Sequence, residues 1–221
     1  MQKLKFSVLL TLAGLLAAGI TGCSHDPRMS DAEKQDVNAQ YTMASKYQKG
    51  SGVDQDNAKA MEWYKKAADQ GSTGAQNNLG VMYEQGEGVT QDYVQAYNWF
   101  KLAAERDNAE AQHNLADLYR RGYGVPQDFN HAVFWYTKAA MHGDTEAQYK
   151  LSEMYYQGQG VAQDYKQAYT WAALAATHKP NDAIKLRDRA AGLLKLEDLV
   201  AAQKASTKLF EEIEAGEART Q

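Results

Sequence analysis

The 221-residue chain contains 28 acidic and 24 basic residues, which gives a net charge of −4. This balance lacks the positive field with which nucleic-acid-binding proteins meet phosphate, and the one short basic run, Arg120-Arg121, is expected to be solvated surface. Cys23 is the only cysteine, so the chain cannot form an internal disulfide.

Residues 1–22 are predicted to be a signal peptide that is removed. Two early lysines make the start positive, and the uncharged run from residue 6 to residue 20 is short for a membrane span of about 20 residues. The segment ends on Ile20-Thr21-Gly22-Cys23, which resembles the lipobox of bacterial lipoproteins. The resemblance implies cleavage before Cys23 and attachment of lipid to that cysteine.

Ser24 stands where a signal for retention in the inner membrane typically has aspartate. The same resemblance therefore implies sorting to the outer membrane, with the protein facing the periplasm. An ordinary secretory signal with a coincidental cysteine is the alternative. Residues 23–36 are polar and contain Pro27, and we expect them to be a flexible tether between lipid and domain.

A 36-residue period runs through the rest of the chain. It is marked by all four tryptophans, Trp63, Trp99, Trp135 and Trp171. An Ala-Gln pair, a tyrosine, a Gly-x-Gly-Val turn and a Gln-Asp pair recur with the same period. A fixed period of this length is typical of repeat architectures, and it predicts four repeats at 37–72, 73–108, 109–144 and 145–180.

Each repeat is predicted to contain two helices. In the first helix, Ala75, Leu79, Met82 and Tyr83 share one face. Capping residues precede each helix, Asp36, Ser72, Asn108 and Asp144 for the first helices and Asp56, Asp92, Asp128 and Asp164 for the second. Glycines end the first helices.

The second helix is predicted to bury Ala96, Trp99 and Ala103, which makes the tryptophans core residues. A column of small residues, Ala44, Gly80, Ala116 and Ser152, is expected to let neighbouring helices approach closely. Lys46 stands where later repeats have Met82, Leu118 and Met154, which indicates an exposed outer face on the first repeat.

Residues 181–221 are predicted to form a C-terminal helical cap and tail. One helix is expected from Asn181 to about Leu194. A second is expected from Leu196 to Glu214, with a stripe of Leu199, Ala202, Ala205, Leu209 and Ile213 and a frayed tail after Gly216. The predicted fold class is all-α, an α/α superhelical solenoid of four 36-residue helix-turn-helix repeats with a C-terminal helical cap.

The row Ala-Gln-x-x-Leu-Gly-x-x-Tyr-x-x-Gly-x-Gly-Val-x-Gln-Asp, with its later Ala-x-x-Trp and Ala-Ala, resembles the Sel-one-like repeat (SLR) family across residues 37–180. The family is a longer-turned relative of the tetratricopeptide repeat, whose first helices line a concave groove. The resemblance implies an adaptor whose groove candidates are Tyr41, Ser45, Asn77, Val81, Glu84, His113, Asp117, Arg120, Arg121, Tyr149, Glu153 and Tyr156. Solvated surface without a selected ligand is the alternative for each of them.

No catalytic constellation, metal site or cofactor is predicted. The glycine turns follow helices rather than strands, and no two histidines stand three or four residues apart. The leading hypothesis is a non-enzymatic, lipid-anchored adaptor that binds a protein or peptide of the cell envelope. One alternative is cell-wall glycan binding or processing by Glu84, Asp117 and Glu153, since hydrolysis needs two carboxylates about 5–10 Å apart.

A third hypothesis is β-lactam binding or hydrolysis, the activity attributed to some cysteine-rich relatives. Those relatives hold two cysteines in each repeat unit, whereas Cys23 lies outside the repeats of this chain. The resemblance is therefore incomplete at the residues that distinguish those relatives.

Overall fold

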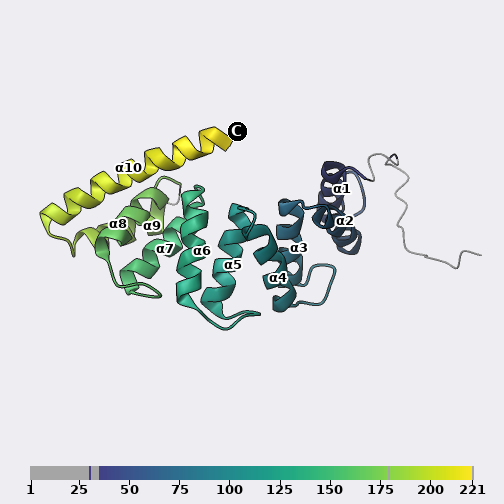
Figure 1. Cartoon of the computed structure of the whole chain (residues 1–221), viewed down its shortest axis with the longest axis horizontal. Helices are drawn as coiled ribbons and strands as arrows, with labels where there is room; N and C mark the ends of the chain where they lie inside the picture. The colour runs from purple at the N-terminus through teal and green to yellow at the C-terminus, as the bar shows by residue number, and fades with distance from the viewer. Residues whose placement is uncertain (1–29, 31–34, 179, 221) are drawn as a thin grey trace, which may run out of the picture.

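The computed structural model describes residue 30, residues 35–178 and residues 180–220. The described residues form ten α-helices and no strand (Figure 1). The first eight make four helical pairs: α1 (Val37–Lys49) with α2 (Asn57–Asp69), α3 (Thr73–Gln85) with α4 (Tyr93–Ala104), α5 (Ala109–Arg121) with α6 (Phe129–Met141), and α7 (Thr145–Gln157) with α8 (Tyr165–Ala175). Two more helices follow, α9 (Pro180–Ala191) and α10 (Leu196–Thr220). The all-α repeat fold is thus confirmed.

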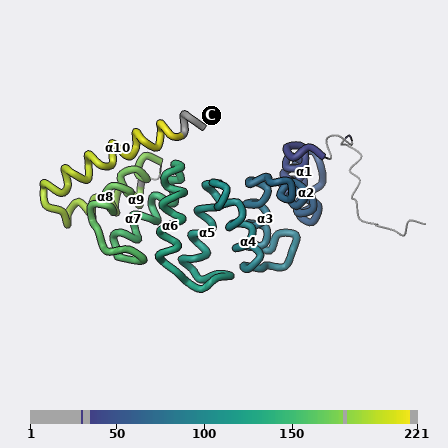
Figure 2. The backbone as a smooth tube through the Cα atoms, in the orientation of Figure 1, coloured from purple at the N-terminus to yellow at the C-terminus, as the bar shows by residue number. Residues whose placement is uncertain are grey.

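The helical pairs follow one another along an arc, which the backbone trace of Figure 2 shows from α1 to α9. From α1 to α9, each helix packs on the next in the chain, so neighbouring pairs cover one another. Among the residues described, none of the helices combines the length and apolarity that crossing a bilayer requires. Cys23 and the predicted signal peptide lie outside the described residues.

The helix ends follow the predicted chemistry. The Asp92 side chain accepts hydrogen bonds from the amides of Val94 and Gln95 at 2.9 and 3.0 Å, and the other seven predicted capping residues accept in the same way. The first helices end on left-handed glycines, Gly50, Gly86, Gly122 and Gly158. These caps satisfy backbone groups that a helix leaves without partners.

Two glutamine columns tie the repeats together. The glutamine of each Ala-Gln pair is buried, and Gln76 and Gln112 donate to the carbonyls of Ala68 and Ala104 at the end of the preceding helix. The glutamine of each Gln-Asp pair donates back to the last turn of the first helix, as Gln91 does to the Glu84 carbonyl at 2.7 Å. The repeated glutamines therefore fix the turns on both sides of α3, α5 and α7.

The tryptophan column is less buried than predicted. Trp63 and Trp171 are buried, but Trp99 and Trp135 are only partly buried. The residue after each tryptophan is at least as deeply buried as the tryptophan, since Tyr64, Phe100, Tyr136 and Ala172 are at most 1% exposed. The expected buried row of Ala96, Trp99 and Ala103 is therefore corrected to Ala96, Phe100 and Ala103.

Phe100 fits closely against Gly80 of the small-residue column. A Cβ atom added at Gly80 would lie 2.5 Å from the Phe100 ring, which is too close for any real contact. Trp99 packs on the cluster formed by α1, α2 and α3. In this repeat the phenylalanine therefore fills the core, and the tryptophan joins one repeat to the one before it.

The C-terminal helices depart from the repeat pattern. α9 takes the place of a fifth first helix, because Ala183 is fully buried and stands 36 residues after the buried Ala147. α10 does not pair with α9 but returns along α8 (Figure 1). Of its predicted stripe, Ala202 and Ile213 are buried while Ala205 is exposed. The helix also runs to Thr220, beyond the predicted end at Glu214.

Candidate functional site

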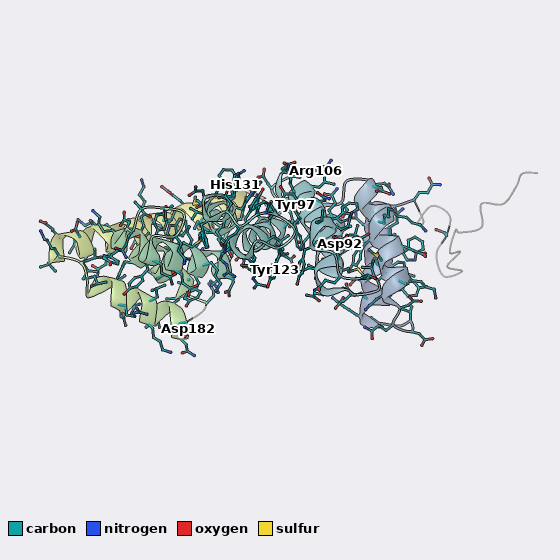
Figure 3. All side chains as sticks on the ribbon, turned by 90° about the horizontal axis from the view of Figure 1, so that it is seen from below. Asp92, Tyr97, Arg106, Tyr123, His131 and Asp182 are labelled. Atoms are coloured by element: carbon teal, nitrogen blue, oxygen red, sulfur yellow. The ribbon has the colours of Figure 1, made fainter. Side chains whose placement is uncertain are left out.

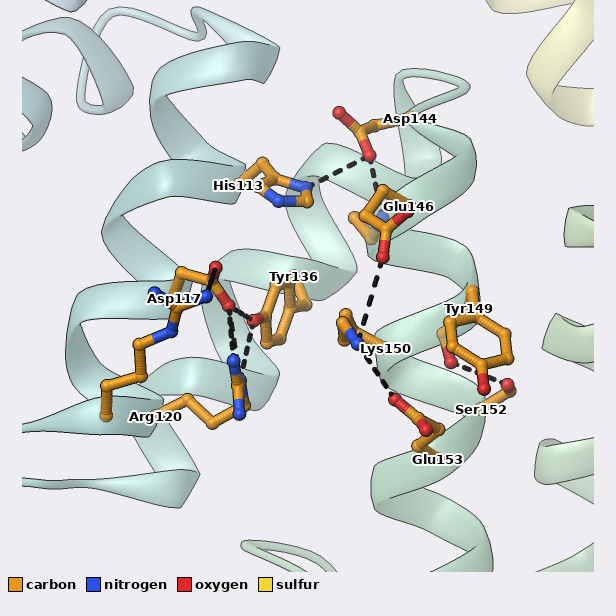
Figure 4. Close-up of polar contacts among 12 residues, drawn as sticks. His113, Asp117, Arg120, Tyr136, Asp144, Glu146, Tyr149, Lys150, Ser152 and Glu153 are labelled. Carbon is orange, nitrogen blue, oxygen red and sulfur yellow. Dashed lines mark hydrogen bonds and ion pairs between the residues drawn. The ribbon is translucent and has the colours of Figure 1, made fainter. Parts of the chain in front are cut away.

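A polar network on α5 occupies the centre of the predicted groove residues (Figure 4). The Asp117 carboxylate pairs with the Arg120 guanidinium at 3.0 Å and with the Arg121 guanidinium at 3.2 Å. The hydroxyl of Tyr136, from α6, donates to Asp117 and accepts from Arg120 Nε at 3.1 Å. Three donors from two helices therefore fix one half-buried carboxylate.

This network shifts the ionisation of its members. Burial alone would raise the pKa of Asp117, but the Tyr136 hydrogen bond and the two arginines outweigh it and lower the pKa. Burial and the adjacent Asp117 charge raise the pKa of Tyr136. Near neutral pH the site thus holds an ionised carboxylate, two guanidinium groups and a neutral phenol.

Glu84 brings α3 to the same site. Burial raises the pKa of Glu84, and the Asp117 charge adds to the increase, while Arg121 and His113 oppose it. His113 also contacts the cap of the next repeat, with Nδ1 3.2 Å from Asp144 Oδ1. Residues predicted separately on α3 and α5 are therefore near enough to act on one another electrostatically.

α7 and α9 continue the polar surface. Lys150 pairs with Glu153 at 3.2 Å and with Glu146 at 3.8 Å. Burial and the Glu153 charge raise the pKa of Tyr149 to about 12. We call this side of α3, α5, α7 and α9 the first-helix face. It contains Glu84, His113, Asp117, Arg120, Arg121, Tyr149, Lys150, Glu153, Tyr156 and Arg189.

Arg189 was not predicted. Its guanidinium lies 4.9 Å from the Tyr156 ring centre and donates to the Tyr156 hydroxyl at 3.3 Å. It stands 36 residues after Glu153, so extending the repeat period into α9 would have found it. Tyr136 was also missed, because its column contains Tyr, Phe, Tyr and Ala and does not show as an identity.

The remaining candidates lie nearer the N-terminus. Tyr41 is exposed, and its hydroxyl accepts from Asn78 at 3.3 Å. Ser45 and Val81 are half-buried. Asn77 is fully buried and accepts a hydrogen bond from Asn114 at 3.0 Å. The expectation that Asn77 faces a groove is therefore corrected, since it lies beneath the surface between α3 and α5.

The arrangement suits binding better than hydrolysis. Glu84 and Asp117 have pKa values shifted in opposite directions, as in acid–base pairs. However, both Asp117 oxygens already face cationic or hydroxyl donors, which leaves a poor nucleophile or base. Ser152 likewise donates to the Tyr149 carbonyl. In residues 35–178 and 180–220, no three His, Cys, Asp or Glu side chains are grouped to hold a metal ion.

Comparisons with known proteins match the repeats. The Sel1 repeat model matches residues 37–72, 73–108, 109–144 and 145–179. A search of curated proteins gives no match. Proteins built from Sel1 repeats generally mediate protein–protein interactions, and the fold is generally a non-enzymatic scaffold.

Two solved structures are similar over most of the chain. One is c5321, a protective antigen of uropathogenic Escherichia coli with an SLR fold, which is 35% identical with a TM-score of 0.76 over 86% of this chain and 41% of that one. The chain thus spans about two fifths of the length of that antigen. The other is a Sel1 repeat protein of Oxalobacter formigenes, 31% identical with a TM-score of 0.71 over 81% and 76% of the two chains. The repeat matches and these structures show that the chain belongs to the Sel1 repeat family.

Proposed function

We propose that the protein is a lipid-anchored adaptor at the periplasmic side of the bacterial outer membrane, and that its first-helix face binds a segment of an envelope protein. The observation that supports binding is the Asp117 network. It holds Arg121 in place while leaving that side chain 44% exposed. Arginine and tyrosine are frequent energetic anchors of interfaces, and a side chain that is already positioned loses less entropy on binding.

The distribution of variable residues supports the same conclusion. The structural columns of alanine, glutamine, glycine and aspartate repeat in every unit. On the first-helix face, by contrast, successive repeats place Val81, Asp117 and Glu153 at one position. Positions that differ while the scaffold stays constant can distinguish one partner from another.

Crosslinking from an envelope fraction tests the binding surface. The change is Arg121→Ala, and the matched control is Arg106→Ala, which removes another exposed arginine. Figure 3 shows Arg106 at the opposite edge of the molecule from Asp182, whose charge acts on Tyr149 of the first-helix face. We expect the wild type and Arg106→Ala to capture the same protein, and Arg121→Ala to lose at least about 80% of it, a change of roughly 1 kcal/mol. Equal capture by all three would remove the first-helix face from the proposal.

Fractionation tests the anchor. The motivating observation is the Ile-Thr-Gly-Cys ending at Cys23, and attachment of two or more acyl chains gives stable membrane binding. In Cys23→Ser cells we expect uncleaved precursor or protein lost from the membrane fraction, with Ser24→Ala as the control that keeps normal processing. Unchanged processing and fractionation of Cys23→Ser would contradict lipid attachment without affecting the binding surface.

A further inference from the structure

The C-terminal helix α10 packs against α8, which is the second helix of the fourth repeat. α10 lies parallel to α8, with Lys166 pairing with Asp198 at 3.2 Å and the Thr170 hydroxyl 3.5 Å from the Ala202 carbonyl. Both contacts join residues 32 positions apart, so the two helices keep one register. Farther along, Leu174 of α8 and Thr177, two residues after the end of α8, line a crevice with Phe210 of α10.

The repeat period identifies the positions on α6 that are equivalent to the α10-covered face of α8. Thirty-six residues before Thr170, Ala173 and Thr177 stand Phe134, Thr137 and Met141. Phe134 is 52% exposed and Met141 is 42% exposed. Thr137 donates its hydroxyl to the Val133 carbonyl, as Thr170 does to the Lys166 carbonyl. The α6 face is therefore apolar in the place where α8 is covered by α10.

The same face of α4 adds two more apolar side chains. Val94 and Leu102 are 53% and 37% exposed, and they match Lys166 and Leu174 in the repeat. In contrast, α2 presents Glu62, Lys65 and Asp69 there. We call the four residues Val94, Leu102, Phe134 and Met141 the second-helix stripe. Apolar side chains gathered on one face of adjacent repeats are typical of an interaction site.

We propose that the second-helix stripe binds an amphipathic helix of a partner protein, which lies parallel to α6 as α10 lies on α8. The stripe continues an interface that the chain already makes, because Ile213 of α10 packs in the same cluster as Val133 and Tyr136 of α6. Recognition of an amphipathic helix by an apolar groove is a general binding mode. This site is separate from the first-helix face and does not depend on its function.

The contacts specify the chemistry of the partner helix. A small residue must lie opposite Phe134, since Ala202 occupies that place on α8. The ammonium group of Lys138 lies 5.6 Å from the ring centres of both Phe134 and Trp135. This positive charge favours an acidic partner helix, although Lys138 stands at the position of Leu174 and not at that of Lys166. The partner is thus an acidic helix with a stripe of alanine and larger aliphatic residues.

A peptide with the sequence of residues 196–216 has Ala202 for the place opposite Phe134 and acidic residues near both ends, and it serves as the probe. Labelled peptide is titrated into the full chain, in which α10 already covers α8, and binding is followed by fluorescence anisotropy. The main variant is Phe134→Asn with Met141→Glu, which copies Asn98 of α4 and its C-cap residue Glu105 from the same positions of the preceding repeat. The second variant, Thr137→Lys, copies Lys101. Because α4 folds with these residues, both variants are expected to fold.

We expect wild-type chain to bind the peptide with a Kd below about 1 mM and both variants to bind at least about tenfold more weakly, a difference of about 1.4 kcal/mol. Leu193→Asn removes an aliphatic side chain of similar exposure, 53%, and should leave binding unchanged. No binding to the wild type, or equal binding by the variants, would overturn the proposal. Two further results would also overturn it. If the wild type forms a dimer in sedimentation and the double variant does not, a second copy of the chain occupies the stripe. If the wild type adsorbs to anionic lipid vesicles and the double variant does not, a membrane occupies it.

Discussion

The contact between Phe100 and Gly80 makes a prediction in which the sign of one substitution depends on the other. Phe100 is fully buried, so Phe100→Ala should lower the free energy of unfolding by ~3–5 kcal/mol. Gly80→Ala alone places a Cβ atom 2.5 Å from the ring and should destabilise by ~1–3 kcal/mol. Alanine in place of glycine inside a helix normally stabilises by roughly 0.5–1 kcal/mol.

With the ring removed, the alanine methyl group enters space that Phe100 has left. In the Phe100→Ala background, Gly80→Ala should therefore stabilise by about 0.5–1 kcal/mol instead of destabilising. Urea unfolding of the wild type, the two single variants and the double variant gives the interaction energy between positions 80 and 100. Unfolding is followed by both circular dichroism and tryptophan fluorescence, because repeat arrays can unfold in parts.

Gly74→Ala is the control within the same helix. A Cβ atom there would meet only the Tyr41 ring, at 3.3 Å, so its effect should be the same with and without Phe100. If Gly80→Ala destabilises equally in both backgrounds, the ring is not what requires glycine at position 80.

Two other substitutions test the site and a turn. Glu84→Gln should raise the melting temperature at pH 7, because the pKa of Glu84 is raised in the folded state and its ionised form is destabilising. When melting is measured against pH, this gain in melting temperature should disappear below the unfolded glutamate pKa of about 4.3. A gain that does not depend on pH would contradict this cause. Gly124→Ala should lower the melting temperature more than Gly52→Ala. Both glycines have positive φ, which costs alanine roughly 1–2 kcal/mol, but only the Cβ atom at 124 would collide with the Tyr93 carbonyl, while that at 52 meets open space. Equal losses of melting temperature would refute the collision.

The helices and their ends could be predicted because they depend on local chemistry. An aspartate or glycine at a helix end interacts with backbone groups within a few residues, and these interactions recur in all four repeats. Which aromatic residue of each second helix is buried could not be predicted from local chemistry. Trp99 and Phe100 differ by 100° around a helix axis, and both fit an apolar face. The structure shows Phe100 inside, because Gly80 leaves room for its ring.

The site was predictable only in part, for a different reason. The period placed Asp117 and Arg121 on one helix, but the contribution of Tyr136 depends on how two helices of a repeat pack. Asn77 was taken as a surface residue because it shares a column with His113 and Tyr149. Its partner Asn114 stands 37 positions away, so this burial required knowledge of the distance between neighbouring repeats. The path of α10 lacked any internal copy from which to predict it.

Lys46 affects whether two molecules of this protein can associate end to end. Later repeats bury Met82, Leu118 and Met154 at its position against the preceding unit, while Lys46 is exposed. A stackable unit with complementary ends would add to itself head to tail and grow into an open filament. An ammonium group at one end would have to be desolvated at every such joint. The lysine therefore disfavours stacking of a second chain on this end of the array.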